Sequence, residues 1–158
     1  SRQFILDNNK KFILINNINI SNKNNNLYLI NSSRSYESDI LHLIKSFKRN
    51  NYNQRWFGSM VADCHHILTN GGIFLYPTCT EFPKGKLNYI IQVLPICFTF
   101  QSCGGIGING NFKPILNKDL NYDLHKNTCK NVSDIILCNI NEYKNIINIL
   151  DIEENIKC

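Results

Sequence analysis

Several residue types and patterns are scarce or missing in this sequence of 158 residues. It has one alanine, one methionine and one tryptophan, and no apolar run approaches the ~18 to 20 residues that a membrane-spanning helix requires. The basic residues are scattered and do not alternate with aromatic residues, as they would in a protein that binds single-stranded nucleic acid. Because the formal net charge is only +5, we expect neither a nucleic acid nor a membrane as a partner.

The cysteine pattern also lacks the signatures of several protein classes. Seven cysteines are irregularly spaced, and no two of them have the Cys-x-x-Cys spacing of zinc sites or redox motifs. An odd number without a regular framework favours reduced, buried thiols over disulfides, as is typical of intracellular proteins. We therefore expect a cytoplasmic protein.

Short apolar strands and amphipathic helices alternate along the whole chain. Strands are predicted at Phe4–Leu6, Phe12–Ile15, Leu27–Ile30, Ile73–Tyr76, Ile106–Ile108 and Ile135–Leu137. Helices are predicted at Glu37–Phe47, Ser59–Asn70, Tyr89–Phe100 (entered or kinked near Pro95) and Glu142–Leu150, with residues 109–131 mostly in a loop. This alternation predicts an α/β fold, with a mixed sheet flanked by helices, in one domain over residues 1–158.

The densest pattern of the chain reads RWFGSMVADCHHILTNGGIFLYP, from Arg55 to Pro77. Ser59 is suited to cap a helix, because its hydroxyl can accept a hydrogen bond from the first turn. The apolar face of that helix is predicted to consist of Met60, Val61, Cys64, Ile67 and Leu68. Asn70-Gly71-Gly72 then tolerates the positive φ angles that end a helix, and a short apolar strand follows.

Three phrases in and after this stretch carry a resemblance to a known family. They are Gly-Ser-Met-Val-Ala-Asp at 58–63, Gly-Gly-Ile-Phe-Leu-Tyr-Pro at 71–77 and Gly-Lys-Leu at 85–87. Through these phrases the chain resembles the class 1 fructose-1,6-bisphosphatases, and the similarity extends more loosely over nearly all of the sequence. It corresponds to the C-terminal, sugar-phosphate-binding half of that family. The Asp-Pro-x-Asp-Gly motif of the N-terminal metal-binding half does not occur in the sequence.

The resemblance implies a metal-dependent phosphoric monoester hydrolase of carbohydrate metabolism. Family members remove the 1-phosphate of fructose 1,6-bisphosphate in gluconeogenesis with Mg²⁺ or Mn²⁺, and they form cytoplasmic homotetramers. Their C-terminal half holds the 6-phosphate and the sugar, whereas most metal ligands belong to the N-terminal half. The resemblance therefore implies a sugar bisphosphate substrate and a homo-oligomer. It implies no catalytic residue within this half and no turnover by these residues alone.

The family's substrate-binding residues fall, by resemblance, on Asn31, Arg34, Arg55, Trp56, Met60, Tyr76 and Lys86. Asn31, Tyr76 and Lys86 keep the family's residue types, and the resemblance implies that they contact the 6-phosphate. Their amide, hydroxyl and ammonium groups are all hydrogen-bond donors that suit phosphate oxygens. Arg34 stands where the family has a tyrosine, and its guanidinium can bind phosphate with a different geometry.

The remaining three positions lie close together in the sequence. Arg55 matches an arginine that reaches into the neighbouring subunit's site. Trp56 replaces a tyrosine, so it keeps an aromatic ring but presents an indole N–H instead of a hydroxyl. Met60 matches the methionine beside the sugar.

Gln92 lies where the family has a glutamate that ligates the catalytic metal. An amide oxygen brings only a dipole to a hard cation, whereas a carboxylate brings charge. Gln92, Arg34 and Trp56 therefore favour an alternative, a degenerate and inactive module that binds sugar phosphates or assembles with other subunits. A sedoheptulose-1,7-bisphosphatase is a weaker alternative, because the phrases Gly-Ser-Met-Val-Ala-Asp and Phe-Leu-Tyr-Pro fit the fructose enzyme better.

Asp63 with His65 and His66 could indicate acid–base chemistry. The sequence shows neither a nucleophile elbow nor a carboxylate placed to orient a histidine. We therefore expect Asp63 on the helix surface and two histidines with structural roles.

Overall fold

A five-stranded mixed sheet forms the centre of the computed structural model, which describes residues 1–20, 23, 25–116 and 131–151. Its strands are β3 (Leu27–Leu29), β4 (Asn53–Arg55), β5 (Ile73–Tyr76), β7 (Gly105–Ile108) and β9 (Ile135–Asn139), in the order β4-β3-β5-β9-β7. Strand β3 pairs in parallel with β4 and β5, and β9 runs antiparallel to both of its neighbours. The three parallel strands, β4, β3 and β5, therefore end at the same edge of the sheet.

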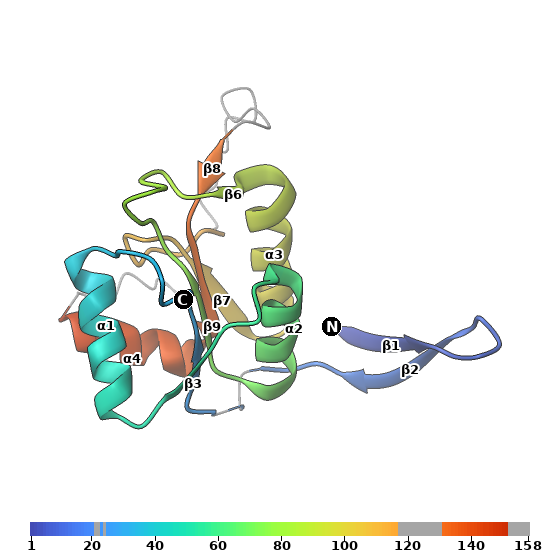
Figure 1. Cartoon of the computed structure of the whole chain (residues 1–158). Coiled ribbons are helices and arrows are strands. Elements are labelled where there is room, and N and C mark those ends of the chain that lie inside the picture. Colours follow the sequence, from blue (N-terminus) through green and yellow to red (C-terminus); the bar gives the residue numbers. More distant parts are fainter. Residues whose placement is uncertain (21–22, 24, 117–130, 152–158) are drawn as a thin grey trace.

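Two pairs of helices cover the two faces of this sheet, as Figure 1 shows. Helices α1 (Ser38–Arg49) and α4 (Ile140–Leu150) cover one face, and α2 (Met60–Asn70) and α3 (Leu94–Ser102) cover the other. Alternation along β5 explains both layers, because Ile73 and Leu75 join the core under α1 and α4 while Phe74 joins the core under α2 and α3. The predicted α/β fold with a mixed sheet flanked by helices is confirmed.

The helix before β7 begins with a wide turn. Residues Tyr89–Val93 form a short π-helix, η1, in which the N–H of Leu94 donates to the carbonyl of Tyr89, and α3 continues from it. Pro95 lies in the first turn of α3, where a backbone N–H would have no acceptor within that helix, so its missing N–H is tolerated. The helix predicted over 89–100 is thus confirmed, and the irregularity expected near the proline takes the form of this π-turn.

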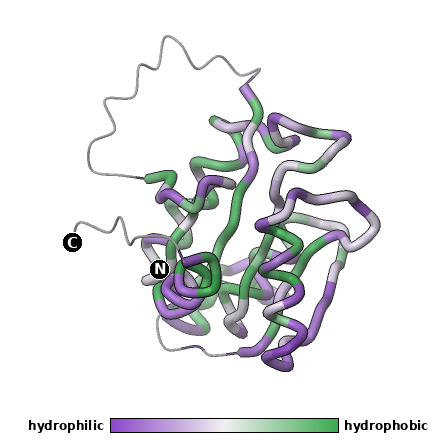
Figure 2. The backbone as a smooth tube through the Cα atoms, turned by 90° about the vertical axis from the view of Figure 1, so that its left-hand side faces the viewer, coloured by the Kyte–Doolittle hydropathy of each residue, from purple (hydrophilic) through white to green (hydrophobic). Residues whose placement is uncertain are grey.

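The first two strands form a hairpin that projects from the body of the domain (Figure 1). Figure 2 shows the body from the side opposite the hairpin, with hydrophobic stretches of the chain, in green, running through its middle. Strand β1 (Arg2–Leu6) pairs antiparallel with β2 (Phe12–Asn17), and no other strand of the described residues pairs with either. Its large apolar side chains are 48–75% exposed; they are Phe4, Ile5, Leu6, Phe12, Ile13, Leu14 and Ile15. We call these residues the apolar hairpin surface.

Three short strands were not predicted from the sequence. These are β4, β6 (Leu87–Asn88) and β8 (Val132–Ser133), of which the last two pair only with each other among the described strands. Each has two or three residues, too few to show an alternating pattern. The loop predicted over 109–131 can be compared only as far as residue 116 and at 131, because residues 117–130 lie outside the described part.

Two expectations about α2 are wrong. Val61 is 75% exposed and does not belong to the apolar face, whereas Cys64, Ile67 and Leu68 are buried as expected. Asp63 is fully buried rather than on the surface, and its Oδ1 accepts a hydrogen bond from the N–H of Phe57 at 3.2 Å. This bond holds the segment before α2 against the first turn of the helix, whereas Oδ2 of Asp63 is buried without a partner among the described residues.

The thiols match the expectation of reduced, buried cysteines where the structure describes them. Five are free and buried, namely Cys64, Cys79, Cys97, Cys103 and Cys138. Burial raises the pKa of the Cys97 thiol to about 12 and also raises the pKa values of Cys64 and Cys138. Cys129 and Cys158 lie outside the described residues. Across the described residues, no helix has both the length and the apolar character needed to cross a membrane.

Candidate functional site

The carboxyl ends of the three parallel strands build one side of a pocket. Asn31 follows β3, Trp56 follows β4 directly, and Tyr76 is the last residue of β5. Because parallel strands that lie next to each other end at the same edge, these residues from distant parts of the sequence lie together. Open α/β sheets commonly bind their ligands at such an edge.

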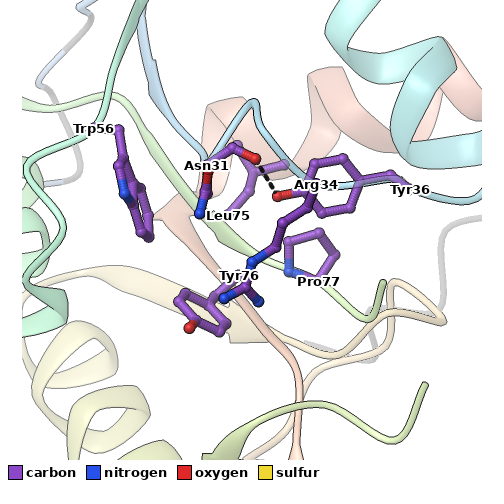
Figure 3. A pocket seen from close by; sticks show the side chains of 7 residues that line it. All are labelled: Asn31, Arg34, Tyr36, Trp56, Leu75, Tyr76 and Pro77. Carbon is purple, nitrogen blue, oxygen red and sulfur yellow. Dashed lines mark hydrogen bonds between the residues drawn. The ribbon is translucent and has the colours of Figure 1, made fainter. Parts of the chain in front are cut away.

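The pocket is a small, shallow hollow that is open to solvent. Figure 3 shows its lining, which consists of Asn31, Arg34, Tyr36, Trp56, Leu75, Tyr76 and Pro77. Four of the seven substrate-binding residues predicted from the sequence line it, namely Asn31, Arg34, Trp56 and Tyr76. The structure thus brings together residues that the sequence separates by as many as 45 positions.

Asn31 is oriented by its own loop. Its Oδ1 accepts hydrogen bonds from the N–H of Ser33 at 3.1 Å and from the Ser33 hydroxyl at 2.7 Å. Its main-chain carbonyl accepts a third from the hydroxyl of Tyr36 at 2.6 Å, drawn as a dashed line in Figure 3. With its oxygen occupied in this way, the amide nitrogen of Asn31 is the group available to donate to an anion.

Tyr36 contributes to this loop as a neutral donor. Burial raises the pKa of Tyr36 to about 12, although the guanidinium of Arg34 acts in the opposite direction. The phenol therefore keeps its proton at neutral pH and keeps donating to the Asn31 carbonyl. The sequence did not single out Tyr36.

Arg34 supplies the positive charge of the pocket lining. Its guanidinium lies 5.6 Å from the ring centroid of Tyr76 and 5.0 Å from that of Phe82, distances at which a cation is attracted to an aromatic ring. Nη1 donates to Cys79 Sγ at 3.8 Å, and Nε lies 3.8 Å from Oε2 of Glu81. The Arg34 side chain is 15% exposed and that of Glu81 is 63% exposed, so an incoming anion meets a cation whose protein counterion is solvated.

Lys86 reaches the same aromatic ring from the other end of the loop. Its Nζ lies 5.0 Å from the Phe82 centroid, although Lys86 is not part of the pocket lining itself. The residue before it, Gly85, has a φ of +85°, and a Cβ there would collide with the backbone of Ser133 in β8. A glycine is therefore required to hold the Lys86 loop against this strand.

Two aromatic residues from these strand ends also line the pocket. The rings of Trp56 and Tyr76 lie 6.0 Å apart with an interplanar angle of 39°. Both side chains are partly buried against the core under α2 and α3, which leaves part of each exposed to the hollow. Such aromatic faces suit an apolar surface of a ligand.

Three further predicted residues lie outside the pocket lining. Arg55 is exposed at the end of β4, and its carbonyl accepts from the N–H of Ile30 at 3.2 Å. Met60 packs, partly buried, against the core under α2 and α3. Gln92 is exposed in η1, where its Oε1 accepts from the N–H of Asn88 at 2.7 Å.

The described residues do not fit a metal centre. Among them, no group of three or more His, Cys, Asp or Glu side chains is placed to hold a metal ion. Gln92 offers a neutral amide oxygen that already accepts a hydrogen bond, a poor substitute for a carboxylate. The pocket lining instead presents one cation, Arg34, beside the neutral side chains of Asn31 and Tyr76.

Several residues at the site were missed by sequence reasoning. Tyr36, Leu75 and Pro77 line the pocket, and Phe82 contacts both of its cations. Leu75 and Pro77 could have been found as the neighbours of Tyr76 at a strand end. Nothing in the sequence distinguishes Phe82 from any other loop aromatic.

Comparisons with known proteins agree with this arrangement. Residues 20–148 match the family model described as fructose-1-6-bisphosphatase, C-terminal domain. A curated relative, fructose-1,6-bisphosphatase 1 of Rattus norvegicus, is 37% identical over 108 residues, which cover 64% of this chain and 30% of the rat protein.

Two solved structures of fructose-1,6-bisphosphatase from Leishmania major are also similar. The holo form superposes with a TM-score of 0.81 at 26% identity, over 94% of this chain and 45% of that one. The T-state gives a TM-score of 0.77 at 25% identity, over 95% of this chain and 46% of that one. The chain thus spans less than half of the length of each of these relatives.

Proposed function

The chain belongs to the fructose-1,6-bisphosphatase family through its C-terminal domain, and we propose that it forms the sugar-phosphate-binding part of such an enzyme. The observation that supports this most is the pocket in which Asn31, Arg34 and Tyr76 meet at the ends of parallel strands. In this proposal, the pocket and Lys86 hold the phosphate distant from the bond that is hydrolysed. Binding at a distant group aligns the reacting phosphate and lowers the entropic part of its barrier.

The proposed contacts follow from the chemistry of each side chain. Arg34 presents several N–H groups and a full charge to phosphate oxygens, and Lys86 adds a second charge. The Asn31 amide and the Tyr76 hydroxyl donate neutral hydrogen bonds, and the Trp56 ring covers the sugar. Hydrolysis, the metal that it requires and the carbohydrate pathway belong to this proposal as properties of the complete enzyme, because the described residues form no metal centre.

Calorimetric titration of the 158-residue chain with fructose 6-phosphate tests this proposal. We expect saturable binding of fructose 6-phosphate and of inorganic phosphate, and none of fructose at the same concentrations. The variants Arg34→Met and Tyr76→Phe should bind more weakly, while Val61→Ala, an exposed change on α2, should bind as the unaltered chain does. Absence of binding by a correctly folded chain, or binding that ignores both site variants, would refute the proposal.

A second candidate, a domain that binds sugar phosphates without turnover, is favoured by Gln92. An amide at that position weakens any metal site that the position serves. We expect the 158-residue chain to bind fructose 1,6-bisphosphate but not to release phosphate from it with Mg²⁺ or Mn²⁺. A rate that follows the protein through repeated purification would contradict this expectation.

We further propose that Arg55 serves the site of a neighbouring subunit in a homo-oligomer. It is exposed at the end of β4 and is not among the residues that line this chain's own pocket. Oligomers that mix Arg55→Ala and Lys86→Ala subunits should regain part of the phosphate-binding sites lost in each variant alone. If mixed oligomers form and regain none, Arg55 does not act between subunits.

A further inference from the structure

Phe82 makes a connection that its neighbours in the sequence do not predict. Its ring centroid lies 5.0 Å from the Arg34 guanidinium carbon and also 5.0 Å from Lys86 Nζ. One aromatic ring therefore contacts a cation from the loop after β3 and a cation from the loop after β5. Two like charges that approach the same ring repel each other, and the negative face of an aromatic ring offsets part of that repulsion.

The backbone that carries Phe82 is held in a fixed turn. Its N–H donates to the Cys79 carbonyl at 2.9 Å, and its carbonyl accepts from the N–H of Cys79 at 3.3 Å and from the N–H of Gly85 at 3.0 Å. Cys79 in turn contacts the guanidinium of Arg34 through its sulfur. The turn thus sets the position of the ring relative to Arg34 before any ligand arrives.

Packing of the core does not account for the Phe82 ring. The side chain is half-buried, and Phe82 belongs to neither of the two apolar clusters formed by the described residues. Lys86, in contrast, is exposed on a flexible side chain, and holding such a chain in one place costs conformational entropy. Contact with a fixed ring reduces the number of positions that its ammonium group explores before binding.

We propose that Phe82 is a positioning residue that holds Arg34 and Lys86 as a pair for a single phosphate group. The inference rests on the proposed function, since it concerns the same anion site. It adds that the affinity of the site for phosphate depends on an aromatic ring that touches the cations and not the ligand. A phosphate dianion gains most from this arrangement, because it can receive both charges at once.

The test compares phosphate affinity in variants of the 158-residue chain by calorimetry at low ionic strength. Phe82→Leu removes the ring but keeps an apolar side chain, and it should weaken phosphate binding on the order of tenfold, because the two cationic side chains must then be ordered when the phosphate binds. Phe82→Tyr restores a ring and should bind phosphate as the unaltered chain does. The control Phe98→Leu changes another exposed aromatic residue, on α3, and should leave phosphate affinity unchanged.

Nuclear magnetic resonance gives a readout that needs no ligand. Ring currents should shift the ε-methylene protons of Lys86 upfield in the unaltered chain and in Phe82→Tyr, and the shift should vanish in Phe82→Leu. Unshifted Lys86 protons in the unaltered chain overturn the inference even if Phe82→Leu does not fold.

The calorimetric outcomes separate the two proposals. If the unaltered chain binds phosphate and Phe82→Leu binds it equally well, the role of Phe82 is refuted while the proposed function stands. If the unaltered chain does not bind phosphate, both are refuted. If Phe82→Leu loses affinity and Phe82→Tyr does not recover it, the ring is not the cause and the inference is again refuted.

Discussion

The hydroxyl of Tyr36 donates a hydrogen bond to the main-chain carbonyl of Asn31 at 2.6 Å. This bond spans the turn that carries Arg34, so one contact closes the loop on which two of the predicted phosphate ligands lie. Tyr36 therefore fixes the loop without supplying a charge. Variants of Tyr36 therefore test the loop structure separately from the side chains that are predicted to bind phosphate.

Replacement of Tyr36 by phenylalanine should weaken both the fold and the pocket. The loss of a partly buried hydrogen bond costs about 1 kcal/mol of unfolding free energy, because the Asn31 carbonyl loses its partner. Phosphate affinity should fall as well, since the loop that orients the Asn31 amide is loosened. Urea unfolding and phosphate titration measure the two effects.

Tyr76→Phe is the matched comparison for this experiment. The Tyr76 hydroxyl donates to no protein group in the described part of the chain, so its loss should reduce phosphate affinity and leave the unfolding free energy nearly unchanged. Equal losses of stability in both variants would show that the Tyr36–Asn31 bond has no special role.

Replacement of Glu81 by glutamine should strengthen phosphate binding. Glu81 is the counterion of Arg34, at 3.8 Å, and an anion that binds Arg34 must compete with it. Because the Glu81 side chain is 63% exposed, solvent screens the pair, and the gain should be no more than about fivefold, the range of a surface ion pair. Phosphate titration at low and high salt measures it, and the gain should shrink as salt rises.

Asp151→Asn provides the control for Glu81→Gln. It changes the net charge of the chain by the same amount but lies at the end of α4, away from the loops that form the pocket. The same gain in both variants would show that total charge, and not the contact with Arg34, sets the phosphate affinity.

Much of the fold could be predicted because its main elements carry strong patterns. The spacing of Ile67 and Leu68 in α2, and the apolar run of β5, reflect burial on a known side of the sheet. Asn31 and Tyr76 could be placed at strand ends because the apolar runs of the two predicted strands stop there. The residue phrases that carry the family resemblance then pointed to the pocket.

The rest depended on contacts that a linear sequence does not display. Strand β4 forms because it pairs with β3, and it has no apolar pattern of its own. Asp63 is buried with one oxygen bonded to the N–H of Phe57, which lies in a different segment from its own helix face, while its Oδ2 has no partner among the described residues. The meeting of Arg34 and Lys86 at Phe82 requires the loops after β3 and β5 to fold toward each other, which no local spacing reports.

Replacement of Glu142 by glutamine should flatten the dependence of stability on pH. Burial raises the pKa of the Glu142 carboxyl, although its hydrogen bonds from Tyr52 and Asn145 act in the opposite direction. Because the folded-state pKa is the higher one, the folded chain holds more protons than the unfolded chain, so this group reduces stability as pH rises from its ordinary value of 4.5 through the raised pKa.

Urea unfolding of Glu142→Gln between pH 4 and 8 tests this reasoning. The variant should be at least as stable as the unaltered chain at neutral pH, since an amide oxygen can still accept from Tyr52. Glu37→Gln changes an exposed carboxylate and should keep the slope of the unaltered chain. If the unfolding free energy of Glu142→Gln changes with pH as steeply as that of the unaltered chain, another group causes the dependence.

The apolar hairpin surface should make the chain self-associate as its concentration rises. Its side chains are 48–75% exposed on a sheet to which the described residues contribute only two strands, and exposed apolar strands of this kind pair with other copies. Ile5 and Ile13 lie directly opposite each other, so Ile5→Lys with Ile13→Glu replaces an apolar pair by a cross-strand ion pair and keeps the hairpin. Sedimentation should show weaker association for this double variant, and phosphate affinity should not change.

Leu41→Lys changes a single exposed apolar residue on α1 and is the control. It should reduce association much less, because Leu41 is not part of the apolar hairpin surface. Equal association of the double variant and the unaltered chain would mean that another surface brings the copies together.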